Sequence, residues 1–355
     1  MPFTQEAALA PTLPPQLDRP VIGLTVGDPA GIGPEIVVKA LREPAMYLLV
    51  RPVVFADRVV LQRAVELLGA GLALHAVPTP AAGRYVAGAI DFVDAGALGD
   101  AIPYGQVSAA GGRAAMAYLE RAVEAALAGQ ITGLVTAPLN KESLQAAGCR
   151  FVDHTEMLRA RAARHEPMTM FMAKTLRIFF LTRHIPFAQV PKAITGEAIV
   201  KALPLSALYL RQLGIERPRL AVAALNPHGG EQGLFGREET DVIAPAIQQA
   251  RAAGVDVCGP VPADAVFHQC LAGRYDGVLS LYHDQGHIAA KTLDFHGTVS
   301  LTMGLQFLRT SVDHGTAFDI AGQGIADARA MVAAIETAAK YADIVRQRAG
   351  LRLKD

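Results

Sequence analysis

Short apolar segments of β type alternate with helical segments along most of the chain, and this alternation constrains the fold more than any other feature. Val21 to Val26 is a short apolar run, and the expected helix after it has Pro34 in its first turn. Residues 109–127 form a long Ala-rich amphipathic segment, and Ile131 to Thr136 is the next candidate for a buried strand. Strands that alternate with helices predict an α/β fold with a mostly parallel sheet. The expected strands are 21–26, 53–56, 131–136, 169–173, 177–182, 220–225, 255–259 and 277–282, and the expected helices include 34–41, 59–68, 109–127, 201–213 and 331–348.

Length, net charge and cysteine content limit the classes of protein to which the chain can belong. The chain has 355 residues, which corresponds to two domains at roughly 100–200 residues per domain. Lys+Arg and Asp+Glu both total 33, so nothing in the net charge points to nucleic acid or a membrane surface as a partner. Cys149, Cys258 and Cys270 form no CxxC pair, which argues against a disulfide framework and favours a reducing compartment.

The N-terminal segment and the apolar runs bear on localisation. Residues 1–19 lack a basic start followed by an apolar run, so we expect a disordered tail there and no signal peptide. No uninterrupted apolar stretch reaches the roughly 18 residues that a membrane span needs. We therefore expect a cytoplasmic protein with no membrane partner.

A glycine-rich turn follows the first expected strand, in the sequence Gly27-Asp28-Pro29-Ala30-Gly31-Ile32-Gly33-Pro34-Glu35. Such a turn can present backbone N–H groups to an anion. The segment matches neither GxGxxG nor GxxxxGK[ST], so it is a poor dinucleotide fingerprint. A tight structural turn at the first strand–helix junction is at least as good an interpretation, and both stay open.

Three histidines come directly after expected strands, inside polar turns: His184, His228 and His283. If those strands lie in one parallel sheet, their carboxyl ends bring the three imidazoles together. Three neutral imidazoles with open positions make a catalytic metal site. Hydrogen-bonded loop histidines are the alternative, and spacing alone does not decide between the two. The remaining histidines at 75, 165, 268, 287 and 296 are interpreted as surface or packing residues, and the absence of HExxH gives no support to a zincin-type protease.

A second group is cationic and consists of His154-Thr155, Lys291 and Arg309. The guanidinium of Arg309, beside the hydroxyls of Thr310 and Ser311, suits a phosphate or carboxylate. Solvated surface charge is the alternative, but Arg309 follows an apolar run over residues 303–308, which favours a buried anion site.

Five motifs follow one another along the chain: 28–35, His154-Thr155-Glu156, Asn226-Pro227-His228, 282–286 and 309–317. In this order they resemble the 4-hydroxythreonine-4-phosphate dehydrogenase family of pyridoxal phosphate biosynthesis, over about residues 20 to 345. The start of the chain and the loop from His314 to Gly324 also resemble the GDGIGPE and HGSAPDIAGKG segments of isocitrate and isopropylmalate dehydrogenases, which bind NAD(P) without GxGxxG. The resemblance implies two α/β/α domains of that type with an active-site cleft between them. The first domain would comprise 20–145 plus 321–355 and contain both termini, and the second would comprise 146–320 and carry the metal and dimer contacts.

The resemblance also implies roles for named residues. His184, His228 and His283 would hold a divalent metal (Zn, Mg or Co), one of them donated by the partner subunit of a homodimer. The substrate would meet His154, Thr155, Lys291, Ser300 and Arg309. Asp264, Asp284 and Lys291 are candidates for the general base, and the sequence does not choose among them. The adenosine end of the cofactor would lie on His314, Gly315, Thr316, Ala317, Asp319, Ile320 and Gly322.

The reaction implied is oxidation of the secondary alcohol of 4-phosphohydroxy-L-threonine by NAD(P), with decarboxylation to 3-amino-2-oxopropyl phosphate. A carboxylate at Asp319 can accept from the ribose 2′-hydroxyl and would repel a 2′-phosphate, which favours NAD over NADP. Ser300 stands where the family has Asn, Asp153 where Gly is common, and Gln306 where Pro is common. These departures keep threonate or erythronate 4-phosphate and a terephthalate-type cis-dihydrodiol open as substrates. The retained pairs His154-Thr155 and Arg309-Thr310 favour a phosphorylated one.

Two other classes of function leave some of these motifs unexplained. A non-catalytic ligand-binding protein on this fold would need no metal histidines, and all three are present. A metallohydrolase using the same histidines would have no use for the loop from His314 to Gly324. An NAD(P)-dependent dehydrogenase is therefore the function that the sequence favours.

Overall fold

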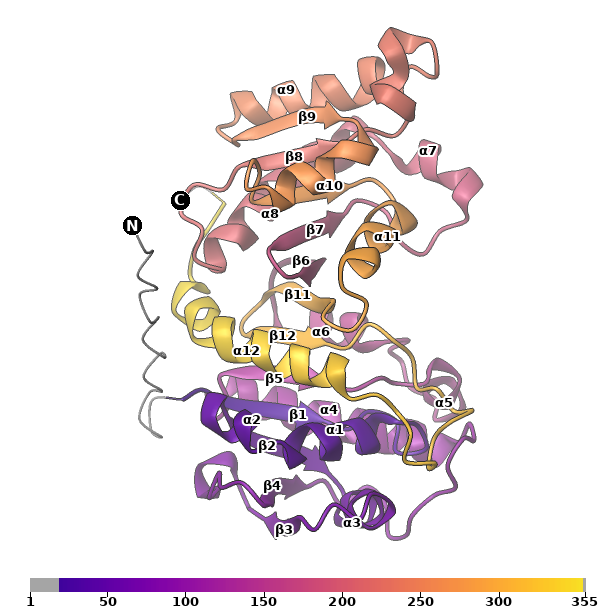
Figure 1. Ribbon diagram of the computed structural model, residues 1–355, viewed down its shortest axis with the longest axis vertical. Coiled ribbons are helices and arrows are strands. Elements are labelled where there is room, and N and C mark those ends of the chain that lie inside the picture. Colours follow the sequence, from indigo (N-terminus) through magenta and orange to yellow (C-terminus); the bar gives the residue numbers. More distant parts are fainter. Residues whose placement is uncertain (1–18, 354–355) are drawn as a thin grey trace, which may run out of the picture.

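The structure, a computed structural model, describes residues 19–353. The tail predicted for residues 1–19 lies outside the described residues except for Arg19, which is buried at the start of the first strand. Within the described residues the strands join in one 12-stranded sheet with helices on its faces (Figure 1). The expected α/β class is confirmed, whereas the division into two domains at 145/146 and 320/321 stays a prediction.

One half of the sheet consists of parallel strands, five from the N-terminal part of the chain and one, β12, from near its C-terminal end. In spatial order these are β3 (Ala73–Ala76), β4 (Ala89–Asp94), β2 (Arg51–Ala56), β1 (Val21–Thr25), β5 (Gly133–Thr136) and β12 (Leu308–Ser311). The sheet continues through β11 (Val299–Leu305), β6 (Ala163–Ala173), β7 (Leu176–Phe180), β10 (Gly277–Ser280), β8 (Leu220–Ala223) and β9 (Val257–Val261). The pairs β12–β11, β11–β6 and β6–β7 are antiparallel, so an antiparallel segment joins two parallel halves.

The helices and strands follow from local sequence in most places. β5, β8 and β10 are fully buried, as expected for parallel strands covered on both faces. The predicted helix at 109–127 has the bounds observed for α4, where the Ser108 hydroxyl caps the helix by accepting from the Gly111 amide at 3.0 Å. The helix expected at 201–213 begins earlier, at Gly196, because Thr195 caps its first turn. Strands β3, β4, β11 and β12 were not expected from the pattern.

The helices bracket the sheet, and α12 closes the chain against β12 and β5 (Figure 1). They are α1 (Gly33–Arg42), α2 (Pro44–Leu49), α3 (Arg58–Leu67), α4 (Ala109–Leu127), α5 (Lys141–Ala146), α6 (His154–Ala162), α7 (Val190–Ala193), α8 (Gly196–Gln212), α9 (Ala244–Ala252), α10 (Ala263–Leu271), α11 (His283–Leu293) and α12 (Arg329–Arg348). Short 3₁₀ turns lie at η2 (Pro80–Ala82), η3 (Phe187–Gln189) and η4 (Pro227–Gly233), and η5 (Glu239–Ile243) is a π-helical turn.

Among residues 19–353, no single helix is long and apolar enough to cross a membrane. Two consecutive helical segments, Phe187–Ala193 and Gly196–Gln212, are together long and apolar enough for a membrane span, but the chain bends by 84° between them.

Two leucines of α4 give a matched test of this packing. Leu119 is fully buried, whereas Leu127, in the last turn of the same helix, is 43% exposed. We expect Leu119→Ala to lower the free energy of unfolding by about 2–5 kcal/mol, because it leaves a cavity in the core. Leu127→Ala should change it by no more than about 0.5 kcal/mol. Denaturant unfolding of both variants measures the difference, and equal costs would contradict the packing described for α4.

Candidate active site

A cavity of about 210 Å³ lies where the carboxyl ends of β5 and β12 meet β11 and the start of α6. Of the residues predicted to meet the substrate, His154, Ser300 and Arg309 line it, as do His314 and Gly315 of the predicted cofactor loop. Thr155 follows His154 on α6 but does not line the cavity. The polar residues of the wall that the sequence analysis did not assign to the substrate are Lys141, Asp153, Ser311 and Asp313.

Arg309 is the most unusual group in this wall, because its charge is buried without a carboxylate partner. The residue is 6% exposed, and its guanidinium donates to the Thr136 hydroxyl at 3.0 and 2.6 Å and to the Thr302 hydroxyl at 3.1 Å. Within the described part of the chain, no carboxylate oxygen lies within 4.0 Å of it. Burial lowers the pKa of Arg309 to about 10, and the charge of Asp153 offsets part of that effect. A buried cation held only by neutral hydroxyls favours an anionic ligand.

His154 adds a neutral hydrogen-bonding group beside this charge. It is the first residue of α6, which Asp153 caps by accepting from the Glu156 amide at 2.9 Å. Burial, and then the charge of Arg309, hold the pKa of His154 well below its usual value. Its Nε2 atom is inaccessible and has no hydrogen-bond partner among the described residues. A neutral imidazole with a free ring nitrogen can bond a substrate oxygen without adding charge.

Lys291, on α11, contacts Asp313 of the same cavity wall. Its ammonium lies 2.7 Å from the Asp313 carboxylate and donates to the Asp313 carbonyl at 3.1 Å. Lys291 also lines a hollow of about 400 Å³ with His283, Asp284 and His287. Among the three candidates for the general base, Lys291 is thus the one that bonds to a residue of the cavity wall. Asp264 is exposed on α10, and Asp284 is bonded to His283 at 2.6 Å.

The three candidate metal ligands follow three adjacent strands, as the sequence predicted. β10 pairs in parallel with β7 and with β8, and His184, His283 and His228 come after β7, β10 and β8 respectively. The rings of His184 and His283 lie 5.7 Å apart between centroids. His228 has a left-handed backbone (φ 53°) and an exposed side chain that faces Glu231 at 3.2 Å.

Within one chain, no group of three or more His, Cys, Asp or Glu side chains in the described part could hold a metal ion. The tertiary structure of the single chain thus brings two of the histidines near each other and leaves His228 apart. The three-histidine site stays a prediction, and it depends on a ligand from a second subunit.

His287 was interpreted as a surface or packing residue, and it does pack, against Phe171 and Phe180. It also stacks on His283, with centroids 3.6 Å apart and planes 12° apart, and its Nδ1 bonds the His283 carbonyl at 2.8 Å. The i,i+4 spacing of the two histidines on one helix was the sequence signal for this contact.

The glycine-rich turn contacts the predicted cofactor loop, and several of its backbone amides bond within the protein. The amides of Ala30 and Gly31 bond to Asp28, and the Ile32 amide donates to the Thr316 carbonyl at 3.0 Å. A Cβ at Gly31 would lie 2.9 Å from Thr316, so only glycine lets the turn approach the loop this closely. Of the two interpretations of the turn, the structural one agrees with these contacts.

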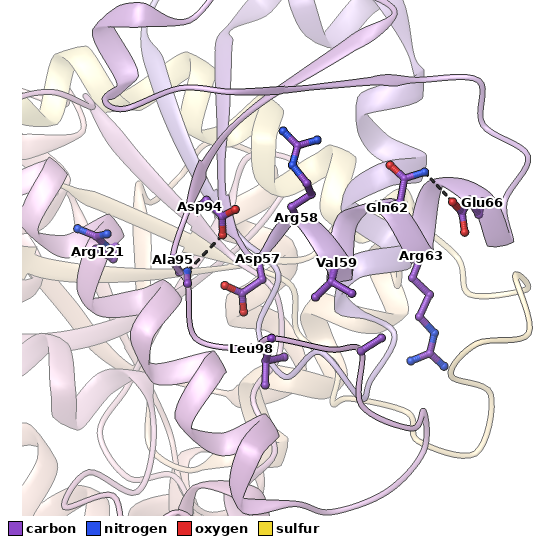
Figure 2. A pocket seen from close by; sticks show the side chains of 13 residues that line it. Asp57, Arg58, Val59, Gln62, Arg63, Glu66, Asp94, Ala95, Leu98 and Arg121 are labelled. Carbon is purple, nitrogen blue, oxygen red and sulfur yellow. Dashed lines mark hydrogen bonds between the residues drawn. The ribbon is translucent and has the colours of Figure 1, made fainter.

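A larger pocket of about 810 Å³ lies elsewhere, beside α3 and the segment after β4 (Figure 2). Its buried carboxylate, Asp57, already accepts from the Tyr118 hydroxyl at 2.7 Å and the Ala97 amide at 2.8 Å. None of the predicted site residues lines it. The smaller cavity at Arg309, with its unpartnered polar groups, is therefore the better candidate for chemistry.

Comparisons with known proteins identify the family of the chain. The family model "Pyridoxal phosphate biosynthetic protein PdxA" matches residues 49–338. The chain is 52% identical over 330 residues to a Symbiobacterium thermophilum protein named "Putative D-threonate 4-phosphate dehydrogenase", covering 93% of this chain and 98% of that one. Solved structures of 4-hydroxythreonine-4-phosphate dehydrogenases from Burkholderia phymatum and Klebsiella pneumoniae are 42% and 40% identical, with TM-scores of 0.81 and 0.85. They cover 91% and 92% of this chain, which in turn covers 98% and 99% of theirs.

Because the pKa of His154 is lowered in the folded protein, the free energy of unfolding depends on pH. In the unfolded chain this imidazole titrates near its ordinary pKa of about 6.5, whereas the folded protein keeps it neutral. The unfolded state therefore binds the extra proton, and stability falls as pH drops below about 6.5. We expect the free energy of unfolding of the wild type to fall by up to about 1.4 kcal/mol between pH 7.5 and 5.5 because of this residue, a loss that His154→Gln abolishes. Denaturant unfolding at both pH values measures it, and identical pH dependence in the two proteins would refute the assignment.

Proposed function

Because the chain belongs to the family of the pyridoxal phosphate biosynthetic protein PdxA and is a dehydrogenase of a phosphorylated hydroxy acid, we propose that it oxidises D-threonate 4-phosphate with NAD(P). The 52% identity to the relative of that name supports this substrate over 4-phosphohydroxy-L-threonine, to whose named dehydrogenases the identity is 40–42%. The sequence motifs implied 4-phosphohydroxy-L-threonine as the substrate and threonate 4-phosphate as an alternative, and the proposal reverses this preference. The observation that carries a phosphorylated substrate is the buried, unpaired Arg309 in the cavity wall.

The proposed reaction removes a hydride from C3 to the nicotinamide and a proton from the C3 hydroxyl. The resulting β-keto acid loses its C1 carboxylate as carbon dioxide, and the enolate takes up a proton to give dihydroxyacetone phosphate. With the 2-amino substrate, the same steps give 3-amino-2-oxopropyl phosphate. The two reactions differ only in the C2 substituent, so selectivity depends on what meets C2.

The cavity residues divide the work by their chemistry. Arg309 and His154 anchor the 4-phosphate, which orients the carbon chain without touching the reacting centre. Ser300, whose hydroxyl can donate or accept one hydrogen bond, suits the polar groups near C2 or C3. Lys291, held by Asp313, is the candidate that exchanges a proton with the substrate at the cavity edge.

One observation favours the 2-amino acid as a second candidate. Asp153 places a carboxylate in the same wall, and a carboxylate can pair with an ammonium at C2. Because Asp153→Asn keeps an oxygen that can cap α6, this variant removes the charge without removing the cap.

The metal proposal rests on His184, His228 and His283, with one of them supplied by a second subunit of a homodimer. Neutral imidazoles suit Zn²⁺ or Co²⁺, and His184 and His283 already lie near each other. Exposed apolar side chains surround these histidines: Phe187 packs on Tyr282, Phe235 faces His228, and Ile288 lies on α11. Apolar side chains exposed beside such a site support a subunit interface there. A bound divalent cation would lower the pKa of the substrate hydroxyl and polarise the ketone.

Arg309→Lys tests the phosphate anchor. Lysine keeps the charge but cannot reproduce the three bonds to Thr136 and Thr302, so we expect KM for the phosphorylated acid to rise by roughly tenfold or more. KM for the cofactor should change little. Arg161→Lys, on the exposed face of α6, is the matched control and should be neutral. An unchanged KM for the acid in Arg309→Lys would remove the anchor from the proposal.

A substrate panel tests the function as a whole. The metal-loaded protein is assayed for nicotinamide reduction with D-threonate, D-erythronate and 4-hydroxythreonine 4-phosphates and a terephthalate-type cis-dihydrodiol, each with NAD and NADP. We expect highest kcat/KM with threonate 4-phosphate, loss of turnover with a chelator or in His228→Ala, and preference for NAD because of Asp319. Highest activity with the amino acid, reduced in Asp153→Asn, would establish the second candidate. Turnover of the diol alone would refute both.

A further inference from the structure

The predicted cofactor loop is clamped at its far end by two residues of α1 that no part of the proposed chemistry uses. We propose that Glu35 and Lys39 are positioning residues that hold the loop from His314 to Ala326 in the arrangement that binds NAD(P). The proposal rests on the proposed function, because it takes this loop as the cofactor site.

Lys39 commits its whole ammonium to the clamp. It donates to the carbonyls of Gly324 and Ala326 at 2.9 and 2.6 Å, and it pairs with the Glu35 carboxylate at 2.9 Å. An ammonium has three N–H donors, so these three partners use all of them. The two carbonyls lie 285 and 287 residues further along the chain, so the contact ties the first helix to the last loop.

Glu35 makes the clamp two-sided. Its Oε1 also accepts from the Ala326 amide at 2.8 Å, and the residue is 2% exposed. The loop backbone therefore gives one donor and two acceptors to the same ion pair. A buried ion pair is costly to leave without one of its hydrogen-bond partners, so the pair and the loop end stabilise each other.

The rest of the loop is held at other points. At its start Asp313 pairs with Lys291, and the Thr316 carbonyl accepts from Ile32. Between Thr316 and Gly324 the described hydrogen bonds are local, such as that from the Gln323 side chain to the Asp319 carbonyl at 2.8 Å. Asp319, which is expected to meet the ribose, is exposed within this stretch. Its position therefore depends on the anchors at both ends, and the Glu35–Lys39 pair is the anchor at the far end, outside the substrate cavity.

A clamp of this kind acts through preorganisation. If the loop without it occupies the binding arrangement about one tenth of the time, the apparent Kd for the cofactor rises about tenfold. Binding of the phosphorylated acid at Arg309 makes no contact with α1 and should change far less.

The test uses the full chain with Lys39→Met, Glu35→Gln and the double variant, which avoids leaving either charge alone in the buried site. Arg346→Met, which removes a helix ion pair of α12 remote from the loop, is the matched control. Hydrogen exchange of the amides in 314–326 is measured without cofactor, and NAD affinity by calorimetry. Steady-state KM values for cofactor and acid are then compared with the wild type.

We expect exchange in this loop to quicken and Kd and KM for NAD to rise roughly tenfold in each clamp variant, with the double variant no worse than the worse single one. Arg346→Met should match the wild type. Faster exchange with unchanged NAD affinity would overturn the positioning role, and unchanged exchange would overturn the clamp itself. If the wild type binds neither NAD nor NADP, the proposed function fails instead, and the exchange data still decide whether the clamp holds the loop.

Discussion

The arrangement of the sheet and of the candidate site depends on the position of β12 in the middle of the sheet. This strand pairs in parallel with β5 and antiparallel with β11, so it is the seam at which one parallel half passes into the antiparallel centre (Figure 1). Arg309 lies on that strand with neighbours on both sides, Thr136 from β5 and Thr302 from β11. Its side chain is thereby fixed by hydroxyls from both sides of the seam while its charge stays unbalanced. The cavity wall favours an anion because β12 places the Arg309 guanidinium between β5 and β11 with no carboxylate from residues 19–353 beside it.

The other cavity residues arrive from the connections that leave the same seam. Lys141 begins the helix after β5, His154 begins α6, and Asp313 and His314 follow β12 directly. Ligand sites of α/β proteins commonly lie at the carboxyl ends of parallel strands, where such connections gather. Here the site combines a buried cation, a neutral imidazole and carboxylates within one small volume. That mixture suits a substrate that carries a phosphate at one end and hydroxyl or amino groups along its chain.

The glycine-rich turn and α1 form a platform for the loop after β12. Gly31 allows the close approach to Thr316, and Glu35 and Lys39 hold the loop where it turns toward α12. A second glycine, Gly322, adopts a left-handed backbone (φ 78°) against the ring of Tyr104, where a Cβ would lie 2.2 Å from the ring. The motif at the start of the chain therefore supports the loop through backbone and side-chain contacts.

Local sequence determined the parts of this protein that depend on near neighbours. The bounds of α4 were predictable because Ser108 caps an Ala-rich helix, and the turns with His184, His228 and His283 were predictable because each follows an apolar strand. Pairings between distant segments were decided only in the tertiary structure, since periodicity specifies which face a residue occupies but not which strand lies beside it. The contact of Arg309 with Thr136 spans 173 residues, and that of Lys39 with Gly324 spans 285. The sequence thus identified the charged side chains and the candidate metal ligands, and the order of the strands decided which of them meet.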